Sequence, residues 1–375
     1  MGEPFKNLLD RSLVRQAAAH LARHDAGFDA QAFERHAARG LDGLEMKARV
    51  MQIADTLERT LSPDFERAAA VLEASLAPPR ETLAEMRSGP DGLAGWVLWP
   101  VGEFVARRGI DHPDRALRTL HALTQRFSAE FAIRPFIVAH PDRVFRTLQT
   151  WTRDDSVHVR RLVSEGSRPR LPWGLRLQSL VLDPSPTLPL LRALQDDPSD
   201  YVRRSVANHL NDIAKDHPER VADWVHEHLP GASPERRALL RHASRGLIKQ
   251  GHRRTLAAWG LDRGLRGQVT LALQPRRVAI GQAVAVSVDL RSTSRQRQRL
   301  AIDLVVHHVK ADGRWSPKVF KGWVVELDAL EQRTLTREHS MRPVTTRRYH
   351  PGTHRIGLRI NGRDVAEANF ELVEA

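Results

Sequence analysis

A single acid, Glu130, lies within an arginine-rich and aromatic stretch that runs from Arg126 to Trp173. Nine arginines fall between Arg134 and Arg176, against four acidic residues in the same window. A carboxylate inside a basic, aromatic surface is suited to chemistry on a polyanion, because the cations can hold phosphates while the acid acts on the bound molecule. The simpler interpretation is a solvated helical face on which Glu130 pairs with Arg134, four residues later.

The composition excludes several classes of protein. The chain has 375 residues, a net charge of +13 and no cysteine, so disulfides, thiolate nucleophiles and Cys-ligated metals are excluded. There is no HExxH motif, and the pairs His307-His308 and His350/His354 have no carboxylate at ligand spacing, so we expect no metal and no cofactor. The longest apolar run, near Leu93 to Val101, is about half of the ~20 residues that a bilayer span needs. We expect a soluble protein.

The hydrophobic pattern changes near residue 265. Before that point apolar residues recur at helical spacing, as in Leu13, Ala17 and Leu21, whereas later ones alternate, as in Val284 and Val286. The pattern predicts an all-α domain over residues 1–265 and an immunoglobulin-like β-sandwich of seven or eight strands over residues 267–375. Residues 266–375 hold 19 basic and 11 acidic residues, so we also expect this part to contribute to binding a polyanion. The alternative is a basic surface domain that only stabilises the chain.

The helical part contains a repeat. The segment from Asp154 to Arg161 matches the segment from Asp197 to Arg204 at an offset of 43 residues, and a weaker copy includes Arg241. Periods near 40 residues are typical of HEAT-type helix pairs, in which we expect each Asp to cap a helix. Arg161, Arg204 and Arg241 would then form a row along a charged groove. The alternative is that the arginines pair with the capping aspartate of the neighbouring repeat.

Five segments carry a resemblance to a known family. They are FKNLL at 5–9, GLEMKARV at 43–50, FSAEFAIRPF at 127–136, HVRRLVSEGSRPRLPW at 158–173 and YVRRSVANHLNDIAKDHPERV at 201–221. Together they resemble the AlkC branch of bacterial DNA alkylation-repair glycosylases over nearly all of residues 1–250. The resemblance implies a mainly α fold, an α-solenoid of HEAT-like repeats, and excision of cationic N-alkylated bases such as 3-methyladenine and 3-methylcytosine from double-stranded DNA. We also expect a monomer in the bacterial cytosol, associated with the nucleoid when bound to DNA.

The resemblance also suggests roles for individual residues. Glu130 stands where the sister AlkD branch has its catalytic Asp, whereas Arg126 and Asn208 replace two tryptophans of that branch's cleft. Trp151 or Trp173 would then supply the aromatic contact with the lesion. Trp151 and Asp155 are one helical turn apart, as the Trp and Asp of the sister branch are, and Asp155 is therefore a second candidate for the catalytic acid.

Little catalytic apparatus is needed for this reaction. An alkylated base that carries a positive charge leaves as a neutral molecule, so one carboxylate can stabilise the oxocarbenium-like sugar and orient water. The candidate catalytic residues are Glu130 and Asp155. The candidate DNA-binding residues are Arg126, Trp151, Arg160, Arg161, Arg168, Arg170, Trp173, Arg204, Asn208 and Arg241. The alternative function is a non-catalytic HEAT-repeat scaffold that binds nucleic acid or a protein.

Overall fold

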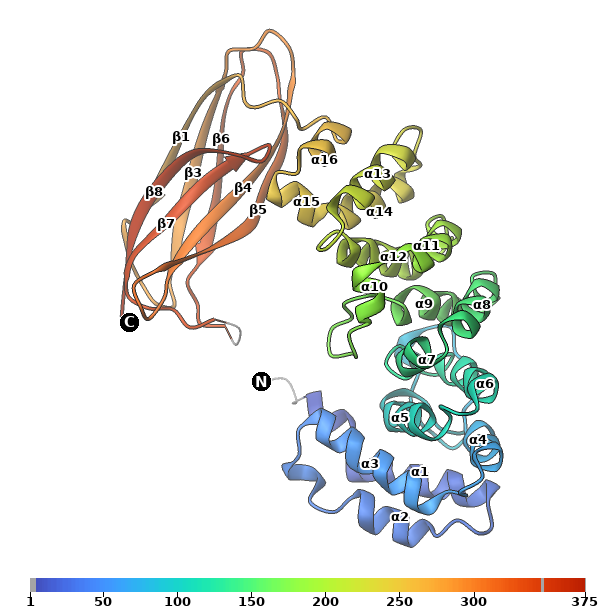
Figure 1. Cartoon of the computed structure of the whole chain (residues 1–375). Coiled ribbons are helices and arrows are strands. Elements are labelled where there is room, and N and C mark those ends of the chain that lie inside the picture. Colours follow the sequence, from blue (N-terminus) through green and yellow to red (C-terminus); the bar gives the residue numbers. More distant parts are fainter. Residues whose placement is uncertain (1–4, 345–346, 375) are drawn as a thin grey trace. The chain divides into compact units, whose positions relative to one another are not determined.

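The chain folds into helices followed by a β-sandwich, as the sequence pattern predicts (Figure 1). The computed structural model describes residues 5–344 and 347–374. Within them the α-helices are α1 Arg11–His24, α2 Ala30–Ala37, α3 Met46–Thr60, α4 Phe65–Ala74, α5 Leu98–Arg108, α6 Pro113–Thr124, α7 Arg134–Ala139, α8 Pro141–Trp151, α9 Val157–Gly166, α10 Gln178–Leu182, α11 Leu188–Leu194, α12 Asp200–Ile213, α13 Pro218–His228, α14 Pro234–Ala243, α15 Arg245–Gln250 and α16 Arg253–Ala258. Single 3-10 turns are η1 Phe5–Leu8, η2 Leu41–Gly43, η3 Leu83–Glu85, η4 Gly95–Val97 and η5 Ser185–Thr187.

A recurring dipeptide opens the helices α6, α8 and α13. Each begins with a proline at its first position, preceded by a histidine at the N-cap. Proline suits this position because its fixed φ is helical and its missing N–H would have no partner in the first turn. Helices then pack in successive layers, with α3 against α5 and α9 against α12. The HEAT-like architecture expected from the repeat is therefore present.

The expected helix caps are wrong by two residues. Asp154 Oδ1 accepts a bond from the amide of Ser156 at 2.8 Å, and Asp197 Oδ1 accepts one from the amide of Ser199 at 2.9 Å. In both copies the serine, not the aspartate, is the N-cap residue. A short Asp side chain readily reaches the amide two residues on, which makes a turn that precedes the helix and does not cap it. The repeated contact confirms that the two segments are equivalent.

In the part of the β-sandwich that the structure describes, eight strands form two sheets. Its strands are β1 Gly267–Gln274, β2 Arg277–Ala279, β3 Ala283–Ser292, β4 Gln298–Val309, β5 Trp315–Leu327, β6 Gln332–Ser340, β7 Gly352–Ile360 and β8 Arg363–Val373. One sheet has the order β1-β3-β6 and the other β2-β8-β7-β4-β5, with only β2 and β8 parallel among these pairs. The core is formed by the alternating residues that the sequence pattern identified, such as Val284 and Val286 on β3 and Ile356 on β7.

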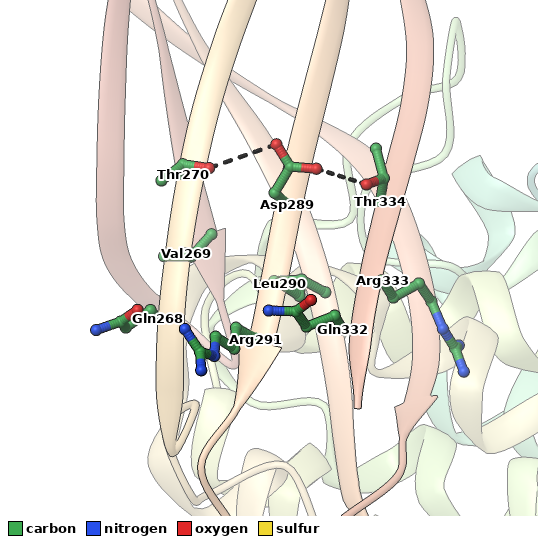
Figure 2. A pocket seen from close by; sticks show the side chains of 9 residues that line it. All are labelled: Gln268, Val269, Thr270, Asp289, Leu290, Arg291, Gln332, Arg333 and Thr334. Carbon is green, nitrogen blue, oxygen red and sulfur yellow. Dashed lines mark hydrogen bonds between the residues drawn. The ribbon is translucent and has the colours of Figure 1, made fainter. Parts of the chain in front are cut away.

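The outer face of the three-stranded sheet is polar. Figure 2 shows Thr270, Asp289 and Thr334 side by side on β1, β3 and β6. Thr334 Oγ1 donates to Asp289 Oδ1 at 2.5 Å, and Thr270 Oγ1 lies 3.5 Å from Asp289 Oδ2. These residues line a shallow hollow of about 320 Å³. Alternation of polar outer and apolar inner residues is what a sheet with one solvated face requires.

By its contacts the chain divides into two units. One extends to Asp216 and includes Ser233–His242, and the other comprises His217–Ala232 and the chain from Ala243 onward. The last helices therefore group with the strands. A reason is visible at the β7–β8 turn, where Gly251 and Gly362 meet so closely that a Cβ on Gly362 would lie 2.6 Å from the Gly251 Cα. The domain boundary that we expect at residues 265–267 separates helices from strands, but contacts cross it.

None of the helices in the described part of the chain has both the length and the apolar character of a membrane span.

Candidate active site

Glu130 lies in the turn that precedes α7, and it is held from one side only. Its Oε2 accepts a hydrogen bond from Ser128 Oγ at 2.7 Å and a second one from Arg161 Nη1 at 2.6 Å, with which it also forms an ion pair. The side chain is 16% exposed. Gly166, at the end of α9, lets the two segments approach, because a Cβ there would lie 2.6 Å from Ile133 Cγ2. Among the described residues Oε1 makes no hydrogen bond, so one carboxylate oxygen is anchored and the other is available.

Arg161 is the partner that fixes the Glu130 carboxylate. Its guanidinium stacks on the ring of Tyr201, 5.0 Å from the ring centroid, and its Nη2 lies 3.7 Å from Glu165 Oε1. Burial by itself would lower the pKa of Arg161, but the charges of Glu130, Tyr201 and Glu165 outweigh it and the pKa is raised. Arg161 was expected to bind phosphate as part of an exposed row. It is instead an internal residue with only 17% of its side chain exposed.

A chain of alternating charges continues from Arg161 into the protein. Glu165 Oε1 accepts from Arg168 Nη1 at 2.7 Å, and Arg168 Nε donates to Asp212 Oδ2 at 2.8 Å. Burial opposes ionisation of Glu165, but Arg161, Arg168 and a bond from Ser205 lower its pKa overall. A buried charge is tolerated only when it is paired and hydrogen-bonded, and each charge here is. Glu130 is the partly exposed end of a pre-formed ionic network.

Arg134 does not pair with Glu130, so the interpretation of Glu130 as an exposed acid with an i+4 partner is wrong. The Arg134 side chain has no exposed surface. Its guanidinium donates to three backbone carbonyls in the segment 166–175. Burial, followed by the charge of Arg168, lowers the pKa of Arg134 to about 10. A helical pattern shows which residues share a face, but it does not show that a neighbouring loop will cover one of them.

Trp173 is the most exposed aromatic side chain of the helical part, with 74% of its surface accessible. Its φ is 64°, in the left-handed region that non-glycine residues rarely adopt. Such a conformation costs about 1–3 kcal/mol and is concentrated at functional sites. The ring lies 6.2 Å from that of Phe5, which in turn packs edge-on against Trp96 at 4.6 Å. The ring of Phe127, three residues before Glu130, lies 5.0 Å from that of Trp96.

The second candidate pair, Trp151 and Asp155, has different surroundings. Trp151 ends α8 and its ring lies 5.3 Å from that of His121. His121 Nε2 donates to Asp154 Oδ2 at 2.7 Å, whereas the exposed Asp155 carboxylate makes no hydrogen bond or ion pair among the described residues. Because α8 ends at Trp151, Asp155 lies in the connection to α9 and not one helical turn from Trp151 on the same helix. Asp155 is also not joined to the ionic network that holds Glu130.

Several of the arginines expected to bind DNA have partners within the protein. Arg160 donates to both oxygens of Asp197, at 2.6 and 3.2 Å, which is the pairing with the neighbouring repeat that we considered as the alternative. Arg170 likewise forms a bidentate pair, in which it donates to both carboxylate oxygens of Asp216. Arg126 donates to the carbonyls of Ala77 and Ala122. These side chains hold adjacent repeats together.

Arg204 differs from the other arginines of the repeat. It lies on α12, is exposed, and makes no hydrogen bond or ion pair among the described residues. It lines a hollow of about 410 Å³ between α12 and α14 together with His242. His242 Nε2 donates to Asn208 Oδ1 at 2.8 Å. Arg241, on α14, is partly buried. An exposed cation beside an open hollow is the arrangement that a phosphate contact needs.

Sequence reasoning missed Tyr201 and Asp212 as parts of the site. Tyr201 supports the Arg161 guanidinium, and Asp212 ends the buried series of charges. Both lie within the second copy of the repeat, 40 and 47 residues after Arg161 and Glu165. The signal that could have found them is the repeat itself, since stacked repeats place equivalent helices side by side. In the described part of the chain, no cluster of three or more histidines or acids could hold a metal ion.

Comparison with known proteins supports a common origin for the whole chain. The family model "DNA alkylation repair enzyme" matches residues 126–247, and a model of the C-terminal Ig-like domain of YhaZ matches residues 268–374. The uncharacterized protein YhaZ of Bacillus subtilis (strain 168) is 35% identical over 334 residues, 88% of each chain. The solved structure of the Pseudomonas fluorescens alkylpurine DNA glycosylase AlkC, bound to DNA with an abasic site analog, is 34% identical with a TM-score of 0.89. That match covers 99% of this chain and 100% of the other.

Proposed function

Because the chain belongs to the DNA alkylation repair enzyme family, we propose that it is a DNA glycosylase that excises cationic N-alkylated bases. The substrates would be bases of the 3-methyladenine and 3-methylcytosine class in double-stranded DNA. These bases carry a positive charge, which is lost when the N-glycosidic bond breaks. The enzyme therefore has no need of an acid to protonate the leaving base, and it must instead stabilise the sugar cation that remains.

The observation that carries this proposal is the asymmetric binding of Glu130. Ser128 and Arg161 hold Oε2, and Oε1 is left for the substrate or for water. A carboxylate fixed in this way faces the oxocarbenium-like sugar with little reorganisation during the reaction. It can also orient the water that completes the hydrolysis. We assign Glu130 as the catalytic residue, with Arg161 and Tyr201 positioning it.

Trp173 is proposed to supply the aromatic contact with the lesion. It is exposed and held in a strained conformation, and it contacts the aromatic group formed by Phe5, Trp96 and Phe127. Phe127 lies three residues before Glu130 in the sequence. Stacking between a base and an aromatic ring contributes roughly 1–3 kcal/mol and tolerates any base. This tolerance suits an enzyme that must find damage in any sequence context.

DNA affinity is proposed to come from exposed cations in both parts of the chain. Arg204, on α12, is the exposed candidate in the repeat. In the sandwich, Arg295 and Arg348 are exposed, whereas Arg297 is paired with Glu326 and Asp328. Phosphate contacts of this kind position a duplex without reading its sequence.

The test is release of free bases from duplex DNA that has been treated with a methylating agent. We expect release of 3-methyladenine by the full chain without added metal or cofactor, and an abasic site in the product strand. A non-catalytic scaffold would bind the same duplex and release no base. Binding without release, at an enzyme concentration above the dissociation constant, would reject the proposed activity.

A further inference from the structure

The loop at residues 167–177, which carries Trp173, has few internal bonds. Within it the Gly174 amide donates to the Leu171 carbonyl and the Leu177 amide to that of Pro169, both at 3.2 Å. Two backbone bonds are little support for a loop that keeps a bulky exposed ring at positive φ. Something outside the loop must hold it.

The side chains of Arg168 and Arg170 tie the first half of the loop to Asp212 and Asp216. Arg134 is the residue that holds both ends of the loop. Its Nε donates to the Leu175 carbonyl at 2.5 Å, and its Nη1 donates to the carbonyls of Gly166 and Arg168, each at 2.8 Å. These carbonyls lie on both sides of Trp173 in the sequence. Gly174 lies directly against the guanidinium, since a Cβ there would be 3.3 Å from Arg134 Nε. One side chain therefore closes the loop at its two ends.

The cost of this arrangement indicates that it serves a purpose. The Arg134 cation is fully buried and no carboxylate pairs with it among the described residues. Burial and the charge of Arg168 lower its pKa, and they outweigh the charges of Asp212, Glu130 and Glu165, which favour the cation. An apolar side chain would fill the same space without that penalty. Arg134 provides hydrogen bonds to the loop carbonyls, and an apolar residue could not form them.

The position of Arg134 relates the loop to the carboxylate. It begins α7, four residues after Glu130, so the turn that presents the acid and the helix that presents the clamp are continuous. We propose that Arg134 is a positioning residue that fixes Trp173 relative to the Glu130 carboxylate. The inference rests on the proposed glycosylase function, and it adds a residue that touches neither base nor sugar.

The first measurement is independent of catalysis. In Arg134→Met, the amides of residues 167–177 should exchange with solvent much faster than in the natural protein, because three carbonyl bonds are lost. The matched control is Arg115→Met, which removes another buried arginine whose carboxylate partners, Glu66 and Glu73, lie on α4. Its stability should fall, but exchange in the loop should not change. Unchanged loop exchange in Arg134→Met would overturn the proposal.

The second measurement separates positioning from general destabilisation. With enzyme in excess, Arg134→Met should slow base release by about 10²-fold, the usual effect of an ångström-scale misplacement, while affinity for the duplex changes little. In a Trp173→Ala background the same substitution should have little further effect, because both act through one loop. Additive losses in this double-mutant cycle would contradict the mechanism.

Two further outcomes are decisive. If Arg134→Met does not fold, Gly174→Ala retains the arginine but places a Cβ 3.1 Å from Leu171 Cδ2 and 3.3 Å from Arg134 Nε. It should speed loop exchange and slow base release, each by a smaller factor than expected for Arg134→Met. A Gly174→Ala protein with native loop exchange and native rate would overturn the inference. If the natural protein released no base at all, the proposed function would fail, whereas the loop exchange would still decide whether Arg134 is the clamp.

Discussion

Replacing Glu130 by Gln removes the negative charge and keeps the shape of the side chain, so it tests the contribution of the charge alone. The amide oxygen of Gln can still accept the bonds from Ser128 and Arg161, and an NH2 group takes the place of Oε1. A carboxylate about 4 Å from a sugar cation contributes roughly 4 kcal/mol at an effective dielectric constant of about 20. That dielectric constant suits a side chain that is 16% exposed. Since about 1.4 kcal/mol corresponds to a factor of ten, base release should slow by about 10²- to 10³-fold.

The same substitution should not weaken DNA binding and should destabilise the fold only slightly. It removes a negative charge from a basic surface, so affinity for the duplex should be unchanged or higher. The bonds from Ser128 and Arg161 are retained, although the one from Arg161 loses its ionic component. We expect a decrease of about 1 kcal/mol in the free energy of unfolding, measured by denaturant titration.

The assay is base release under single-turnover conditions, with enzyme in excess over methylated duplex. Asp155→Asn is the matched control, because it removes the charge of an exposed acid that has no bond to the ionic network. Its rate should equal that of the natural protein. Full turnover by Glu130→Gln together with loss of turnover in Asp155→Asn would refute the assignment of Glu130 and favour the pair formed by Trp151 and Asp155.

Three other predictions test the aromatic contact, the phosphate contact and the core of the sandwich. Trp173→Gly should slow base release while the midpoint of thermal unfolding stays the same or rises, since glycine adopts a φ of 64° without strain; a fall in both would indicate a purely structural role. Arg204→Ala should weaken binding to every duplex about equally and reduce the slope of log K against log salt by roughly one, whereas Arg160→Ala, which breaks an internal ion pair, should leave that slope unchanged. Burial, followed by positive charges that include Arg347, lowers the pKa of His308 to about 3, so unfolding below pH 6.5 binds a proton. The contribution of His308 to the stability of the sandwich should be complete above pH 6.5 and decline as the pH falls toward 3. Thermal unfolding at several pH values measures this, and an equal decline in His308→Gln would exclude His308 as the cause.

The sequence by itself determined the architecture, because helices and strands bury their apolar faces at different periods. The spacing of Leu13, Ala17 and Leu21 and the alternation of Val284 and Val286 were sufficient to predict a helical part followed by a sandwich, and both are present. The 43-residue offset likewise identified two equivalent repeats. These are local patterns, and local patterns survive without knowledge of distant contacts.

The tertiary structure alone decided which charged residues have partners. Arg161 and Arg204 occupy equivalent positions in two copies of one motif, yet Arg161 is bound to Glu130 and Arg204 is exposed. Arg134, the arginine expected to pair with Glu130, is four residues later in the sequence, but the actual partner, Arg161, is 31 residues away. Long side chains reach across repeats, and burial depends on segments distant in the sequence. Only folding could place one carboxylate oxygen of Glu130 under restraint and leave the other available.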